Sequence, residues 1–131
     1  MIYEESVRTP AAQCFVDVTH LVAKAVKASG MTDGHILVSV PHTTAALTIN
    51  ENADPAVVSD MLRRLEQTFP THDPADRHAE GNSHAHVKSS LLGTCHSFIV
   101  SGGALVLGTW QGIYLCEFDG PRTRRLVVST S

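Results

Sequence analysis

The chain has 131 residues, 43% of them hydrophobic and 18% charged, with a formal net charge of −3 at pH 7. This length fits one domain that can bury a core without stabilising cross-links, and the composition is typical of a globular protein. The slightly acidic balance excludes a general attraction to nucleic acid or to an anionic membrane surface.

No apolar stretch approaches the roughly 20 residues of a membrane-spanning helix, and the acidic start of the chain does not read as a signal peptide. The cysteines are three, widely spaced and without a Cys-x-x-Cys pair. That usage is typical of reduced thiols rather than of a disulfide framework. We therefore expect one cytoplasmic domain, residues 1–131, with no membrane partner.

The first third of the chain predicts a strand, a helix and a second strand. Residues 14–18 are β-branched and aromatic, which indicates a strand. Thr19 is the expected cap of a helix over residues 20–28, and Gly30 is its expected stop. The apolar run 35–40 then predicts a buried strand.

After Pro41 the sequence predicts another strand, another helix and a polar loop. Residues 45–50 predict a strand with alternate apolar side chains on one face. Asp54 as the cap and Pro55 as the first helical residue predict a helix that ends near Phe69. Residues 71–83 then form a polar loop of a length that is often functional.

The remainder predicts one more helix and a series of strands. Asn82 or Ser83 can cap a helix that ends at Gly93. Turn residues separate the strands that follow, which we expect at residues 97–101, 104–108, 110–118 and 124–130. This order predicts an α+β domain with two to three helices on a largely antiparallel sheet.

A histidine-rich run, residues 78–88, carries the densest chemical signal, because imidazole is the commonest metal ligand and titrates near neutral pH. A helix would bring His84 and Lys88 to one face, whereas an extended segment would pair His84 with His86. The spacing leaves both arrangements open. It is equally compatible with histidines that only bond the backbone of a polar loop.

Two further polar sites follow apolar strands. His42, Thr43 and Thr44 come directly after the buried strand 35–40, where ligand-binding groups often lie, although a solvated turn explains them as well. The segment Asn50-Glu51-Asn52-x-Asp54 stands at a helix start. That position satisfies free backbone N–H groups and is also a potential anion site.

The last third adds two polar motifs. Trp110 is the only tryptophan and is expected in the core, yet Gln111 beside it is unusual in a buried strand. Arg122 and Arg124 would share a strand face and could bind phosphate or carboxylate, or simply keep an edge strand solvated. No aromatic residues interleave with these arginines, which argues against nucleic-acid binding.

Five ordered motifs resemble the YjbQ family, often labelled secondary thiamine-phosphate synthase, from about residue 10 to the end of the chain. They are Pro41-His42-Thr43-Thr44-Ala45, Asn50-Glu51-Asn52-x-Asp54, His78-x-x-x-Gly81-Asn82-x-x-Ala85-His86-x-Lys88-x-x-Leu91-Leu92-Gly93, Gly103-x-Leu105-x-Leu107-Gly108-Thr109-Trp110-Gln111 and Phe118-Asp119-Gly120-Pro121-Arg122-x-Arg124.

The resemblance implies a partly barrel-like sheet, a homotrimer with polar clefts near subunit boundaries, and a divalent metal, commonly zinc. The implied metal ligands are His42, His78 and His86, with Asn82 and Lys88 lining the site. His84 has a secondary role. Three imidazoles and a water would leave the open position of a catalytic zinc.

The activity that the resemblance implies is thiamine-phosphate synthesis, a side activity that joins hydroxymethylpyrimidine diphosphate to thiazole phosphate and releases pyrophosphate. We expect His42, Asn82, His86 and Lys88 to act in catalysis on a small phosphorylated metabolite. The residues expected to bind that metabolite or a cofactor are Thr43, Thr44, Asn50, Glu51, Asp54, Gln111, Arg122 and Arg124. The alternatives are a non-enzymatic metal- or metabolite-binding protein and a structural trimer with buried histidine networks.

Overall fold

A computed structural model describes residues 1–131 and contains eight strands and three helices. The elements in chain order are β1 (Ile2–Arg8), β2 (Cys14–Asp17), α1 (Thr19–Ser29), β3 (Gly34–Ser39), β4 (Ala45–Glu51), α2 (Pro55–Thr68), α3 (Ser83–Leu92), β5 (Cys95–Ser101), β6 (Ala104–Leu105), β7 (Gln111–Glu117) and β8 (Thr123–Thr130).

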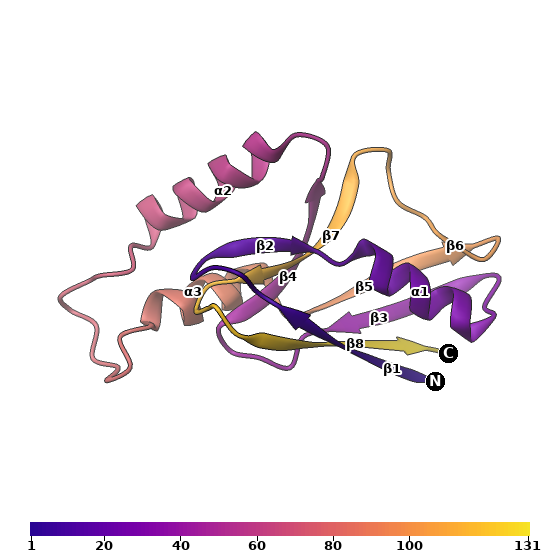
Figure 1. Cartoon of the computed structure of the whole chain (residues 1–131), viewed down its shortest axis with the longest axis horizontal. Helices are drawn as coiled ribbons and strands as arrows, with labels where there is room; N and C mark the ends of the chain where they lie inside the picture. Colours follow the sequence, from indigo (N-terminus) through magenta and orange to yellow (C-terminus); the bar gives the residue numbers. More distant parts are fainter.

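The strands form two antiparallel sheets (Figure 1). The larger sheet has the order β1-β8-β3-β5-β6 and curls into part of a barrel, and the smaller has the order β2-β7-β4. Every strand pairing is antiparallel. The predicted α+β class, with a largely antiparallel and partly barrel-like sheet, is confirmed.

The main core lies between the larger sheet, α1 and one face of the smaller sheet. Strand β3 shows the two-residue period that builds it, because Ile36 and Val38 are buried while Leu37 is 45% exposed. Helix α1 covers this core with Val22, Ala25 and Val26. The outer face of the larger sheet is therefore left to solvent.

A second core cluster fills the opposite face of the smaller sheet. It contains Ala46, Ala85, Tyr114, Cys116 and Phe118, against which side chains of α2 and α3 pack. Strand β7 is consequently buried on both faces, which explains its continuous apolar run. None of the three helices is long and apolar enough to span a bilayer.

The helix ends confirm most of the predicted signals. Asp54 accepts a hydrogen bond from the N–H of Ala56 and α2 begins at Pro55, as expected. Gly30 ends α1 in the left-handed conformation. Thr19, in contrast, is the first residue of α1 and not its cap: Val18 holds the cap position without a side-chain hydrogen bond, and the Thr19 N–H donates to Asp17 Oδ1 at 2.9 Å.

Three features differ from the sequence expectations. Strand β1 was not predicted, although it pairs with β8 along its whole length. Strand β6 is only two residues long. Trp110 is 62% exposed rather than in the core, since it lies in the turn that precedes β7.

Two short connections, residues 40–44 and 93–94, lie side by side where the chain reaches the edges of the two sheets. Residues 40–44 connect β3 of the larger sheet to β4 of the smaller one. Residues 93–94 connect α3, which packs on β4, to β5 of the larger sheet. A hydrogen bond of 2.9 Å from the N–H of Val40 to the Thr94 carbonyl joins the two connections, and one of 2.9 Å from the N–H of Leu47 in β4 to the Gly93 carbonyl holds the second connection against the smaller sheet.

Candidate functional site

A polar cavity of about 290 Å³ lies between these two connections and α3. Its lining contains no hydrophobic residue and no Lys, Arg, Asp or Glu. Two imidazoles and several hydroxyls face it together. The lining residues are His42, Thr43, His86, Ser89, Ser90, Gly93 and Thr94.

His42 is held in one orientation by the larger sheet. Its Nε2 atom accepts a hydrogen bond of 2.9 Å from the backbone N–H of Arg125 in β8. Burial and the neighbouring Arg124 guanidinium lower the pKa of His42. A neutral imidazole that accepts at Nε2 carries its proton on Nδ1, so His42 offers an N–H donor to a ligand.

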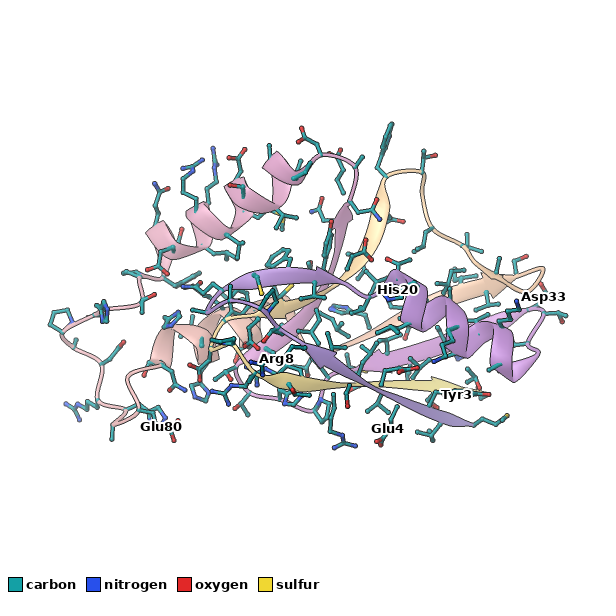
Figure 2. The ribbon with its side chains drawn as sticks, in the orientation of Figure 1. Tyr3, Glu4, Arg8, His20, Asp33 and Glu80 are labelled. Carbon is teal, nitrogen blue, oxygen red and sulfur yellow. The ribbon has the colours of Figure 1, made fainter.

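His86 lies between His42 and His78. The rings of His78 and His86 meet edge to face, with centroids 5.5 Å apart. His78 belongs to the loop before α3, beside Glu80, whose Oε2 atom is 4.0 Å from His78 Nε2. Figure 2 shows Glu80 projecting from the outer edge of this loop. His78 thus contacts His86 from a side that does not line the His42 cavity.

The predicted zinc ligands do not form a ready site within one chain. No group of three or more His, Cys, Asp or Glu side chains is arranged to hold a metal ion. The Nε2 atom of His42 is also occupied by the Arg125 N–H. His42 and His86 share a cavity, but His78 does not join them there.

Lys88 is fully buried and does not line the cavity. Its Nζ atom donates to Glu66 Oε1 at 2.9 Å and to Gln13 Oε1 at 3.1 Å, and lies 2.8 Å from His84 Nδ1. An ammonium group has three N–H donors, and these partners use all of them. Burial and the Lys88 charge lower the pKa of His84, so this ring is a neutral acceptor.

Arg124 is likewise committed inside the protein. It forms a buried, two-pronged ion pair with Glu117, and its Nη2 atom also donates to the Thr44 hydroxyl at 2.9 Å and to the Thr44 carbonyl. Thr9 donates to the same carboxylate at 2.7 Å. This network fixes the backbone immediately after His42 and Thr43.

Asn82 and Arg122 meet at Asp119. The Asp119 Oδ2 atom accepts from Asn82 Nδ2 at 2.8 Å and from Arg122 Nη2 at 3.1 Å. Asn82 therefore links the start of α3 to the turn before β8 and makes no side-chain cap. Arg122 keeps a half-exposed guanidinium, so it is the one predicted arginine with surface left for a ligand.

The remaining predicted residues lie at the other end of the smaller sheet. Asn50 and Glu51 end β4, and Glu51 pairs with Gln111 at the start of β7. Asp54 caps α2, and Gln111 accepts from the Gly108 N–H. Strand β4 advances about 3.3 Å per residue, which places this end roughly 20 Å from the His42 turn. The structure does not bring these four residues to the cavity.

The sequence analysis missed Ser89, Ser90 and Thr94 in the cavity lining. Their signal was the Ser-Ser pair in the last turn of the predicted helix, followed by Gly93-Thr94 at its end. It also missed Glu117, a charged residue within the apolar run of β7. An acidic side chain in such a run indicates a buried partner, here Arg124.

Comparisons with known proteins place these features in one family. Residues 3–131 match the model described as "UPF0047 protein YjbQ-like". The chain is 50% identical to the UPF0047 protein YugU of Bacillus subtilis, covering 95% of this chain and 94% of that one. It is 44% identical to the UPF0047 protein MJ1081 of Methanocaldococcus jannaschii over 98% and 92% of the two chains.

Solved structures agree with the sequence comparisons. A YjbQ/UPF0047 family protein from Clostridium acetobutylicum superposes with a TM-score of 0.95 at 52% identity, covering 97% of this chain and 98% of that one. The conserved hypothetical protein TT1486 of Thermus thermophilus gives a TM-score of 0.92 at 46% identity, with coverages of 98% and 99%. The chain belongs to the YjbQ-like UPF0047 family.

Proposed function

We propose that this protein is an enzyme that acts on a small phosphorylated metabolite in the cavity between His42 and His86. The observation that carries the proposal is the shared cavity itself, because it gathers two histidines from distant parts of the chain and surrounds them with hydroxyl groups. Polar groups converging on one hollow are the usual mark of a ligand site.

The candidate reaction is thiamine-phosphate synthesis. The ring nitrogen of thiazole phosphate attacks the methylene carbon of hydroxymethylpyrimidine diphosphate. A C–N bond forms, the C–O bond to the diphosphate breaks, and pyrophosphate leaves with the bonding electrons. The attacking nitrogen carries no proton, so the reaction needs donors for the leaving group more than a general base. Arg122, the predicted arginine whose guanidinium stays half exposed, is a suitable donor.

The test is pyrophosphate release by purified, untagged protein with both substrates. His86→Ala is expected to lower turnover by about 100-fold, because His86 lines the cavity and a substrate misplaced by about 1 Å loses that much rate. His20→Ala, on the exposed face of α1 (Figure 2), is the matched control and should retain full turnover. Wild-type release no faster than that of His86→Ala would contradict the assignment.

A divalent metal, zinc in particular, and a homotrimer remain proposals that belong together. One chain offers His42 and His86 but no third ligand beside them, so a metal site needs a neighbouring chain or a movement of the His78 loop. Exposed Leu37 and Ile99 on the outer sheet face, and Val87 and Leu91 on α3, support self-association.

Metal analysis and light scattering of untagged protein test this pair of proposals. A true site saturated at a thousandfold excess of zinc over its dissociation constant would stabilise the fold by about 4 kcal/mol. An unchanged melting temperature with added zinc would exclude the metal. A monomeric mass at micromolar concentration would exclude the trimer.

A non-enzymatic binding protein is the second candidate, and one observation favours it. The cations expected to assist the leaving group, Lys88 and Arg124, are bound internally by Glu66 and Glu117. Binding of the substrates by calorimetry without pyrophosphate release would support this reading over the first.

A further inference from the structure

We infer that the His42–His86 cavity receives an uncharged, hydrogen-bonding part of the ligand, bound by the Ser89 hydroxyl, and that any phosphate lies outside it. The inference rests on the proposed ligand site but not on turnover. It assigns Ser89 a role in specificity and predicts how a phosphorylated molecule is oriented.

Ser89 provides the first argument. The residue is 2% exposed and lines the cavity, yet its Oγ atom has no hydrogen-bond partner. Serine hydroxyls within helices often bond the carbonyl four residues back, and Ser89 makes no such bond. Buried hydroxyls without partners are uncommon because they lose their hydration without compensation. A ligand atom in the cavity would supply the missing partner.

Charge provides the second argument. A phosphate group is recognised by Arg, Lys or the N-terminal end of a helix. The cavity lining contains no Lys or Arg, and the nearest buried cations, Lys88 and Arg124, are already paired. A phosphate placed here would lose its hydration and would form no ion pair with a lining side chain.

The direction of α3 provides the third argument. Ser89 and Ser90 lie in the last turn of this helix, and the chain leaves it at Gly93. The C-terminal end of a helix carries the negative end of its dipole and repels anions. An uncharged nitrogen heterocycle has N–H donors and ring acceptors that suit serine hydroxyls and a histidine N–H. The cavity therefore fits that class of group and disfavours phosphate.

The experiment compares two simple probes by NMR of the labelled, full-length protein at pH 8. Uncharged 4-aminopyrimidine is expected to shift the amide signals of Ser89, Ser90 and Thr94. Inorganic phosphate at the same concentration should leave them unshifted. Phosphate shifting these amides as strongly as 4-aminopyrimidine, or 4-aminopyrimidine leaving them unchanged, would overturn the inference.

Ser89→Ala tests the residue itself. Losing one hydrogen bond between uncharged groups should weaken 4-aminopyrimidine binding about fivefold. The melting temperature should be unchanged or higher, because the free protein loses no hydrogen bond. Ser59→Ala, the same change on an exposed position of α2, is the matched control and should alter neither quantity. Equal affinity of Ser89→Ala and wild type would contradict the role of Ser89.

The two proposals fail separately. If the probes behave as expected but no pyrophosphate is released, the enzymatic assignment fails and the orientation stands. If pyrophosphate is released while Ser89→Ala keeps the wild-type KM for hydroxymethylpyrimidine diphosphate, the orientation fails and the enzyme stands.

Discussion

The ammonium nitrogen of Lys88 lies 2.9 Å from the Oε1 atom of Glu66, and this ion pair joins α3 to α2. Helix α2 has no fully buried residue of its own and is otherwise held by partly buried Val58, Leu62 and Leu65. In Figure 1 it stands apart from the larger sheet. Glu66 also accepts from Gln13 Nε2 at 3.1 Å, so this one carboxylate ties α2 both to α3 and to the segment before β2.

Glu66→Gln should destabilise the protein by about 2 kcal/mol. Breaking a fully buried ion pair costs about 3–5 kcal/mol, but the Glu66 side chain is 40% exposed, so water recovers part of the loss. Urea unfolding measures the change. Asp60→Asn removes a carboxylate that is 67% exposed on the same helix, and it should cost under about 0.5 kcal/mol. Similar costs for both variants would show that Lys88 does not depend on Glu66.

Lowering the pH should weaken the Lys88–Glu66 ion pair and so lower the free energy of unfolding. Burial alone would raise the pKa of Glu66, but hydrogen bonds from Thr71, Lys88 and Gln13 outweigh it and lower that pKa from 4.5 to about 2. A carboxyl with a lowered pKa stabilises the fold above its unfolded-state pKa and loses this contribution as the pH falls. Between pH 4.5 and pH 2, wild type should therefore lose more unfolding free energy than Glu66→Gln. Parallel curves would contradict this.

His84 should make stability fall at a milder pH. Its lowered pKa means that the folded protein keeps this ring neutral, while the unfolded chain protonates it near pH 6.5. The free energy of unfolding should hold above that pH and decrease as the pH falls below it. His84→Asn keeps an acceptor for Lys88 and cannot protonate, so it should lose less stability between pH 7 and pH 5. His20→Asn, on an exposed position, should follow wild type.

Glu117 and Arg124 should show strong non-additivity. Both side chains are almost fully buried, so Glu117→Gln or Arg124→Met alone leaves a charge without its partner and should cost about 3–5 kcal/mol. The double variant removes both charges and should cost much less than the sum. Denaturant unfolding of wild type, the two single variants and the double variant gives the coupling energy between Glu117 and Arg124. A coupling energy below about 0.5 kcal/mol would contradict the expected non-additivity.

Gly112→Ala should destabilise the protein, because the added methyl group would clash with Asn52. An added Cβ would lie 2.8 Å from Asn52 Cβ and 2.5 Å from Asn52 Nδ2, which now donates to Asp17 at 3.1 Å. Moving Asn52 should cost about 1–3 kcal/mol. At Gly108 the nearest atom is 3.5 Å away, so Gly108→Ala should change the melting temperature little. Equal melting temperatures for the two variants would refute the close approach.

Local signals in the sequence predicted much of this fold. Asp54-Pro55 and Gly30 act at helix ends in ways that depend on neighbouring residues alone, and both were placed correctly. Strand β1 was missed because its stability comes from pairing with β8, more than 100 residues later in the chain. Its alternation of Tyr3, Glu5 and Val7 toward the interior was the available signal.

The site was predicted in part for the same reason. His42, Thr43 and His86 do share a cavity. Lys88 and Arg124 carried the right chemistry for an anion site, but long-range partners, Glu66 and Glu117, occupy them. Residue type and spacing predict what a side chain can bind. They do not reveal which distant carboxylate has already bound it.

The cavity lies between the connections at residues 40–44 and 93–94, so a bound ligand would contact both of them. The first leads from the larger sheet to the smaller one, and the second leads from α3, which packs on the smaller sheet, to the larger sheet, so the positions of His42 and Thr94 depend on how the two sheets are placed. A molecule that touches both would act as a cross-link between layers. Amide hydrogen exchange in β3 and β4 should then slow together on binding, because neither layer could open without releasing the ligand.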